Sequence, residues 1–458
     1  MTRLTLNRTG ARTMAWRSSA VLAAGVLTLA ACSGDNGAAP EEEPEATGSA
    51  TADGGSEAAG GDGNAEIRFS WWGSDERHTL TQEVIDLFME KNPDITVVPD
   101  YTDWGGYWDK LATTVAGGDT PDVMTQEERY LTDYANRGVV GDLAALGLDT
   151  SMIDPSVIQS GTIDGKLAGV ATGINAYAIV ADPQIFEEAG VEMPDDTTWT
   201  WDDFVSISTE ISDALGDDVY GVQDYGGNEA GFNIYARQHG ESLYAEDGSL
   251  GYEDATLEAW WQHLVDLRAA GAMPDGARSV EIAEGGPEQS LLGTNSGAMG
   301  MWWTNQLGAI SSAAGRDLVL LRLPGESESE RTGMYFKPAM FYSVAADTEY
   351  PEAATAFVDF LINDPEAGAL ILSDRGLNAN TDVRAAVSDQ LDPLEQQAAE
   401  FLAALESEIV DGPPAPPNGA ADVPEITGRI NEQVLFDTIS PAEAAAQFTS
   451  EASAAIGQ

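Results

Sequence analysis

The sequence predicts an α/β fold built on two separate cores. The chain has 458 residues, and the part from residue 66 onward is long enough for two domain-sized cores. Residues 66–98 have the pattern of a strand, a helix and a second strand, which is typical of a parallel α/β unit. Residues 167–180 are apolar and interspersed with small side chains, which predicts an extended segment that crosses between the cores. Ligand crevices in such folds lie beyond the carboxyl ends of the strands.

The first residues have the features of an export signal. Four arginines precede an apolar run at residues 20–31, which ends in Leu-Ala-Ala-Cys at Cys32. This pattern predicts a secretory signal peptide over residues 1–31, and a short membrane anchor that is never cleaved is the alternative. The ending resembles a lipobox, in which Cys32 is diacylated and becomes the mature N-terminus. Cys32 is the only cysteine, so the fold must hold together without an intramolecular disulfide.

Residues 32–65 are predicted to comprise the lipidated cysteine and a disordered, solvated tether. They are rich in Gly, Ala, Ser, Thr, Pro and acidic residues and contain no aromatic or large aliphatic side chain, so they cannot bury a core. The whole chain carries 77 Asp and Glu against 21 Lys and Arg, a formal net charge of −56. A surface this acidic repels phosphate backbones, which excludes nucleic acid as a partner. Solubility, including in salty surroundings, is the simplest explanation of the charge.

Two adjacent tryptophans end the first predicted strand. Ile67 and Phe69 alternate with polar neighbours, and Trp71 and Trp72 follow them before a helix that we expect to begin near Thr79. Neighbouring side chains of a strand point to opposite faces, so both rings cannot enter one core. We therefore expect at least one of them to lie in a cleft. The alternative is that both pack under a loop.

Gln126 and Glu127 follow a second short predicted strand at residues 123–124. A position at the carboxyl end of that strand would place both side chains at the same crevice. The alternative for Glu127 is that it and Glu128 only favour the start of the helix that follows. In the second half of the chain, Trp199 and Trp201 lie beside a helix start expected at Thr200, with Asp203 three residues on, and Trp260 and Trp261 belong to an amphipathic helix. All four tryptophans are predicted to be structural.

Several separate motifs resemble one known family. They are GKLAGVATGINAYAIVADPQIFEEAG at residues 165–190 followed by WTWDDF at 199–204, the Gly-x-x-Pro-Asp-Val pattern at 118–123, LLGTNSGAMGMWW at 291–303, and SDRGLNAN at 373–380. Together they resemble, in the same order, the extracellular solute-binding proteins (family 1) of carbohydrate ABC transporters, the maltodextrin-binding-like group.

The resemblance implies a two-lobed periplasmic-binding-protein-like fold of type II, with a ligand cleft between lobes joined by a multi-segment hinge. Lobe 1 is expected to comprise residues 66–173 and 345–410, and lobe 2 residues 174–344 and 411–458. The expected connections are residues 173–180, residues 339–345, and the proline-rich stretch 411–420.

The resemblance also implies a sugar site. Aromatic rings cover the apolar C–H faces of a sugar, and amide, carboxylate and guanidinium groups saturate its hydroxyls. In the family, one aromatic residue near position 302 stacks on a sugar ring, whereas this chain has two adjacent tryptophans there. The candidate ligand contacts are Trp71, Trp72, Arg77, Gln126, Glu127, Asn175, Tyr225, Asn228, Trp302, Trp303, Tyr335 and Arg375.

The function implied is that of a monomeric, lipid-anchored receptor on the outer face of the cytoplasmic membrane. It would close on a sugar or oligosaccharide and deliver it to the permease of an ABC importer. The three histidines have no metal-binding spacing, and no GxSxG motif or phosphate loop occurs, so we expect neither an enzyme nor a metal or cofactor. A surface-anchored hydrolase or lyase with a hidden carboxylate pair is the alternative, as is a binding protein for another solute, such as iron or a polyamine.

Overall fold

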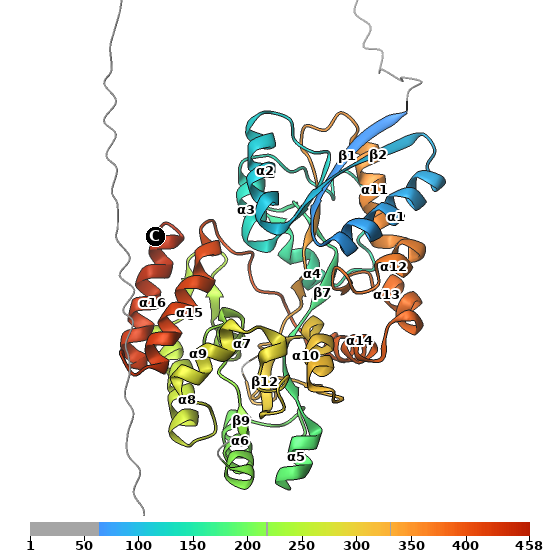
Figure 1. Ribbon diagram of the computed structural model, residues 1–458. Coiled ribbons are helices and arrows are strands. Elements are labelled where there is room, and N and C mark those ends of the chain that lie inside the picture. Colours follow the sequence, from blue (N-terminus) through green and yellow to red (C-terminus); the bar gives the residue numbers. More distant parts are fainter. Residues whose placement is uncertain (1–63, 217–218, 330) are drawn as a thin grey trace, which may run out of the picture. The chain divides into compact units, whose positions relative to one another are not determined.

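The computed structural model describes residues 64–216, 219–329 and 331–458 (Figure 1). The predicted signal peptide, Cys32 and all but the last two residues of the predicted tether lie outside the described residues. In the described part, no helix is both long and apolar enough to span a membrane.

The first sheet has the strand order β2-β1-β3-β15-β6. Strands β2 and β3 both run parallel to β1, and β15 runs antiparallel to β3 and to β6. This arrangement confirms the predicted parallel α/β unit. The strands are β1 (Ala65–Trp72), β2 (Ile95–Thr102), β3 (Val123–Gln126), β15 (Phe341–Val344) and β6 (Val170–Ala171).

Helices pack around this sheet, and we call the sheet and these helices lobe 1. Helix α1 begins at Asp75 rather than near Thr79, because the Ser74 side chain caps the backbone N–H of Arg77 and two acidic residues occupy the first turn. The helices are α1 (Asp75–Lys91), α2 (Trp104–Ala116), α3 (Glu128–Asn136), α4 (Pro155–Ser160), α11 (Pro351–Asn363), α12 (Pro365–Ile371) and α13 (Thr381–Val387), with the 3₁₀ turn η3 (Ser388–Gln390) and the hairpin β4 (Thr162–Ile163) and β5 (Lys166–Leu167).

The second sheet has the order β13-β8-β12-β9 and is the centre of lobe 2. Its strands are β8 (Tyr177–Ala181), β9 (Tyr220–Val222), β12 (Gly297–Trp303) and β13 (Val319–Leu321). The predicted structural role of Trp260 and Trp261 is confirmed, since both are buried on α8 (Asp254–Ala269). The predicted helix start at Thr200 is confirmed by a capping box with Asp203.

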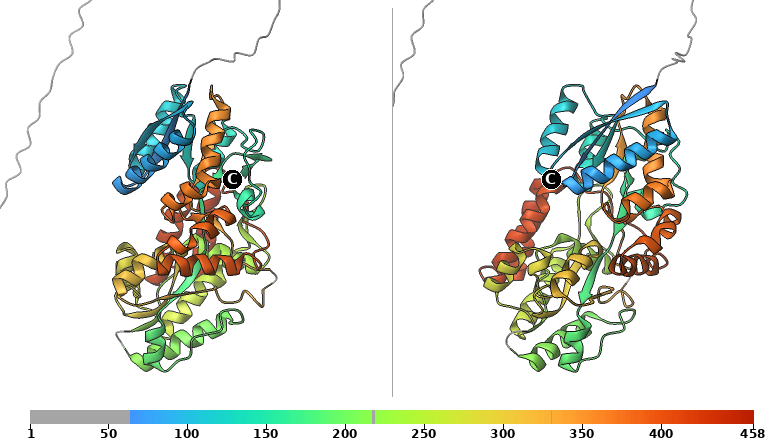
Figure 2. Two further views of the ribbon diagram at one scale, coloured as in Figure 1. Left: turned by 90° about the vertical axis from the view of Figure 1, so that its right-hand side faces the viewer. Right: turned by 45° about the vertical axis from the view of Figure 1, so that its right-hand side comes forward.

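The remaining elements of lobe 2 surround this sheet. They are α5 (Pro183–Ala189), α6 (Trp201–Leu215), α7 (Glu229–Gln238), β10 (Ser242–Tyr244), β11 (Leu250–Gly251), α8 (Asp254–Ala269), α9 (Gly276–Glu284), η1 (Pro287–Gln289), η2 (Thr304–Gln306), α10 (Leu307–Ala314), η4 (Ala420–Asp422), α15 (Val423–Leu435) and α16 (Pro441–Ala455). Figures 1 and 2 show the blue strands β1 and β2 apart from the green and yellow elements of lobe 2, with the orange helices α11 and α12 beside blue α1.

The predicted crossing segment is confirmed. The chain passes from β6 in the first sheet through β7 (Gly173–Asn175) to β8 in the second sheet. Strand β7 is the middle strand of a small hinge sheet, between β14 (Lys337–Pro338) and β16 (Leu377–Asn378). A Cβ atom at Gly173 would lie 2.5 Å from the carbonyl oxygen of Arg375, so glycine permits this close approach of two segments.

The return segment differs in detail from the expectation. We expected an inter-lobe strand at residues 339–345 and a lobe boundary at 344. Strand β14 makes the crossing instead, and β15 already pairs with β3 of the first sheet. Helix α14 (Pro393–Leu405), expected in lobe 1, packs against α10 and β13 of lobe 2. The third connection, before η4, contains neither helix nor strand, since its prolines have no N–H to donate.

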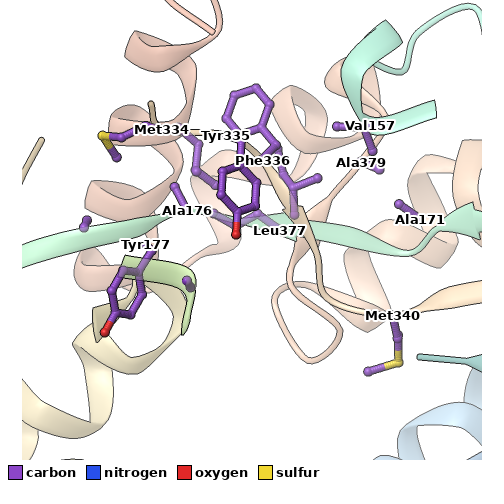
Figure 3. Close-up of a cluster of buried hydrophobic side chains, with 14 of the residues drawn as sticks. Val157, Ala171, Ala176, Tyr177, Met334, Tyr335, Phe336, Met340, Leu377 and Ala379 are labelled. Carbon is purple, nitrogen blue, oxygen red and sulfur yellow. The ribbon is translucent and has the colours of Figure 1, made fainter. Parts of the chain in front are cut away.

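Buried apolar side chains fill the hinge. Figure 3 shows side chains from α4, from the crossing and return segments, and from the β16 region packed together. All are less than 9% exposed. A hinge of this kind is a packed core rather than a loose linker, so it permits a limited set of lobe movements. The labelled residues are Val157, Ala171, Ala176, Tyr177, Met334, Tyr335, Phe336, Met340, Leu377 and Ala379.

Candidate functional site

A pocket of about 290 Å³ lies where lobe 1, lobe 2 and the hinge meet. The start of α3 supplies its lobe 1 wall, the start of α7 and the end of β12 supply its lobe 2 walls, and the proline-rich connection closes it. We call it the cleft pocket. Its lining residues are Glu128, Arg129, Asn228, Glu229, Ala230, Asn233, Leu243, Tyr244, Trp303, Tyr335, Lys337, Pro413, Pro414, Pro416, Ala420 and Pro424.

Three of the predicted contacts line the cleft pocket: Asn228, Trp303 and Tyr335. Asn228 is also the N-cap of α7, where its side-chain oxygen accepts from the backbone N–H of Ala230. Trp303 is half-buried at the end of β12, and its ring centroid lies 4.9 Å from that of Tyr177. The pocket thus offers an aromatic ring that packs against Tyr177 and remains partly exposed.

The two basic residues that line the pocket each form an ion pair with an acidic residue of α3 or its cap. Lys337, on the hinge strand β14, pairs with Glu128. Arg129 pairs with Glu127, with 3.1 Å between Nε and Oε2. Burial lowers the pKa of the Lys337 ammonium, but the carboxylates of Glu128 and Glu127 outweigh burial, so this pKa is raised above its ordinary value.

Glu229 is the remaining charged residue of the pocket, and it sits in the first turn of α7. Among the described residues, no backbone or side-chain group of another residue donates a hydrogen bond to the Glu229 carboxylate. Burial raises the pKa of the Glu229 carboxyl, and the neighbouring charges of Arg129 and Lys337 oppose that rise.

We expected at least one of Trp71 and Trp72 to lie in a cleft, but both are buried and neither lines the cleft pocket. Trp71 is 1% exposed and stacks on Phe69, and its Nε1 donates to His78 Nδ1 at 3.1 Å. Trp72 is 7% exposed and packs on Tyr107 on the opposite face. Helices α11 and α2 pack against β1 on opposite faces of this mixed sheet, so the two adjacent rings enter different cores.

Gln126 and Glu127 do lie at the carboxyl end of β3, as predicted. Gln126 is fully buried, and among the described residues neither of its side-chain polar atoms has a hydrogen-bond partner. Glu127 is the N-cap of α3 and accepts from the backbone N–H of Arg129 at 2.9 Å. The structure therefore shows the helix-start role that was the alternative for Glu127.

The two predicted arginines make contacts within the protein. Arg77 pairs with Asp374, with Nε 2.9 Å from Oδ2, and its Nη2 donates to the Asp374 carbonyl at 2.8 Å. Arg375 is 2% exposed and donates to Tyr342 Oη and Thr81 Oγ1. Both guanidinium groups connect distant segments of the chain, and neither lines the cleft pocket.

Asn175, Tyr225 and Trp302 also lie outside the cleft pocket. Asn175 lines a second pocket of about 290 Å³ beside β7 and β16 and accepts from Thr304 Oγ1 at 3.4 Å. Tyr225 is buried in the lobe 2 core, where its ring lies 5.0 Å from that of Trp260, and burial raises its pKa. Trp302 is half-buried on β12, one residue before Trp303.

Sequence reasoning missed Lys337, Arg129, Glu229, Asn233 and Tyr244. Glu229 could have been predicted as a site residue, because it directly follows the predicted contact Asn228 in the sequence. Lys337 carried no such signal, since its partner Glu128 is 209 residues away. Within the described residues, no group of three or more His, Cys, Asp or Glu side chains could hold a metal ion.

Comparisons with known proteins agree with this architecture. Residues 73–368 match the model of the bacterial extracellular solute-binding protein family. A binding protein of Brucella abortus is 26% identical over 181 residues, which cover 37% of this chain and 42% of that protein. The chain thus matches less than half the length of such relatives.

Two solved structures illustrate the likeness of fold. An extracellular solute-binding protein (family 1) of Alicyclobacillus acidocaldarius has a TM-score of 0.75 and 26% identity, with 87% of this chain and 100% of that chain covered. A periplasmic oligogalacturonide-binding protein of Yersinia enterocolitica has a TM-score of 0.75 and 22% identity, with 86% and 100% covered. The fold is therefore that of two-lobed periplasmic solute-binding proteins. On the family match, which spans more than half of its length, the chain belongs to the bacterial extracellular solute-binding protein family.

Proposed function

We propose that this protein binds a sugar or oligosaccharide in the cleft pocket and delivers it to the permease of an ABC importer. The main support for this proposal is that residues from both lobes and from the hinge line the same pocket. A ligand held by groups from both lobes stabilises the state in which the lobes are close, because it contacts both walls only in that state.

The chemistry of the lining supports a carbohydrate ligand. Trp303 and Tyr335 provide aromatic surface for the C–H face of a sugar ring. Asn228, Asn233 and Glu229 provide amide and carboxylate groups for ring hydroxyls. The Yersinia relative in fold is named for binding an oligogalacturonide, which also favours a saccharide.

Export and anchoring belong to the same proposal. The predicted signal peptide and the Leu-Ala-Ala-Cys ending at Cys32 support a lipoprotein on the outer face of the cytoplasmic membrane. The acidic residues that follow would then tether the lobes within reach of the permease.

A screen of oligosaccharides tests the proposal and separates it from the enzyme alternative. Thermal unfolding and calorimetry should show at least one saccharide that raises the melting temperature, and mass spectrometry should recover it unaltered. Release of a shorter product or an unsaturated sugar would instead support a hydrolase or a lyase. If only metal ions or polyamines stabilise the protein, the carbohydrate proposal is wrong.

A further inference from the structure

The lining of the cleft pocket has two acidic and two basic side chains, and Glu127, which pairs with Arg129 beside the pocket, adds a third carboxylate. Lys337 is paired with Glu128, and Arg129 is paired with Glu127. Glu229 faces the same space with no such partner among the described residues. Both cations are therefore already engaged, and one half-buried carboxylate is left for a ligand.

Glu229 differs from the many acidic residues on the surface. A surface carboxylate is hydrated and interacts weakly with its neighbours. Glu229 has lost part of its hydration, which is costly unless a hydrogen-bond donor replaces the water. A hydroxyl or an ammonium group of a bound ligand is such a donor, whereas a ligand carboxylate would be repelled.

The second pocket also has acidic residues in its lining, but Asp374 pairs with Arg77 and Asp392 caps α14. It takes residues from β7, β16, η2 and α14, and its acidic lining residues are Asp374, Asp392 and Glu395. Among the described residues, no lysine or arginine lines it.

On the basis of the proposed function, we infer that the ligand is a saccharide without carboxylate groups, neutral or carrying an amine, and that Glu229 determines this specificity. Glu229 accepts a hydroxyl or ammonium donor of the bound sugar. Uronic-acid saccharides are disfavoured, because a ligand carboxylate would share Lys337 and Arg129 with Glu128 and Glu127 and would lie beside the unpaired Glu229. This separates the chain from the Yersinia relative, whose name specifies an oligogalacturonide.

Calorimetry on the full chain with trisaccharides of matched length tests the inference. The neutral probes are maltotriose, cellotriose, xylotriose and the methyl ester of trigalacturonic acid; the cationic probe is the glucosamine trimer; the anionic probe is trigalacturonic acid. The tightest binder should be neutral or cationic, and trigalacturonic acid should bind at least about tenfold more weakly than its methyl ester.

Two variants test whether Glu229 is responsible for the discrimination between the acid and its ester. Glu229→Gln keeps the shape of the side chain and should reduce the discrimination between the acid and its ester by about tenfold. Glu253→Gln, at an exposed N-cap outside the pocket, changes the net charge equally and should leave that ratio unchanged. A purely structural role of Glu229 would alter the melting temperature and leave the ratio unaltered.

The contradicting outcomes are distinct. If trigalacturonic acid binds most tightly, or if Glu229→Gln leaves the ratio unchanged, the inference is wrong and carbohydrate binding stands. If no trisaccharide of any charge binds, the proposed function itself fails, and the inference fails with it.

Discussion

The ammonium of Lys337 lies 5.8 Å from the centroid of the Trp303 ring. Lys337 belongs to the hinge strand β14, whereas Trp303 ends the central strand β12 of lobe 2. The same ammonium pairs with Glu128, at the start of α3 in lobe 1. One side chain therefore contacts both lobes from the hinge, and a movement of the lobes must change at least one of these contacts.

Trp303→Ala should weaken saccharide binding by roughly 1–3 kcal/mol, because the indole removes apolar sugar surface from water. The apo protein should keep a melting temperature close to that of the wild type, since Trp303 is only half-buried. Trp261→Ala is the matched control: its ring is fully buried, and its loss should lower the free energy of unfolding by about 3–5 kcal/mol. Calorimetry and thermal unfolding of both variants distinguish the two roles. Unchanged affinity of Trp303→Ala would remove this residue from the site.

Asp411→Ala should destabilise the hinge. The Asp411 carboxylate accepts from Arg237 at 2.7 Å and from Arg331 at 3.0 Å, and Arg237 is 1% exposed. Removing the carboxylate leaves a buried guanidinium without its counter-charge, which should cost about 1–3 kcal/mol of unfolding free energy. Glu281→Ala breaks an exposed pair with Arg278 and should cost less than about 0.5 kcal/mol. Equal urea midpoints for the two variants would argue against the buried ion pair.

The stability of the protein should fall as the pH rises from the ordinary pKa of glutamate to about 7, in a way that depends on Glu326. Burial raises the pKa of this carboxyl to about 7, against opposing hydrogen bonds from Gln238, Met334 and Gly333. In the unfolded chain Glu326 loses its proton near the ordinary pKa of glutamate. The protonated carboxyl therefore contributes its full stability below that pH, and the contribution is lost by the time the pH has passed about 7.

Comparing the wild type with Glu326→Gln isolates this contribution. The difference in unfolding free energy between pH 5 and pH 8 should be larger in the wild type, by on the order of 2 kcal/mol. Parallel pH profiles of the two proteins in urea unfolding would contradict the raised pKa.

Cys32→Ala should release the exported protein from the membrane fraction without unfolding its lobes, because nothing after the predicted tether depends on the lipid. Ser33→Ala retains the cysteine and should remain with the membranes. Fractionation followed by thermal unfolding of the released protein measures both effects. If Cys32→Ala still sediments with the membranes, the lipobox interpretation is wrong.

Local patterns in the sequence predicted the elements that local forces determine. The crossing segment was recognisable because an apolar run with small residues is suited to an extended chain in two sheets and a hinge. The helix at Thr200 was recognisable from its capping residues. By contrast, Trp71 and Trp72 were misjudged because the sequence of one strand does not show that helices cover both faces of its sheet.

The parts of the site that could not be predicted depend on long-range pairing. Arg375 was expected at the ligand, but its donors are taken by Tyr342 and Thr81, 33 and 294 residues away. Lys337 was not expected there at all. Such partners come together only through the complete fold, and no periodicity or spacing in the chain reports them.

Hydrogen exchange in the presence of a bound saccharide tests the location of the site most directly. With the tightest binder of the oligosaccharide screen at saturation, peptides at the start of α3, at the start of α7 and around β14 should all become protected, because they line the pocket from both lobes and the hinge. Protection confined to one lobe, or centred on the separate pocket between α13 and α14, would contradict a ligand site between the lobes.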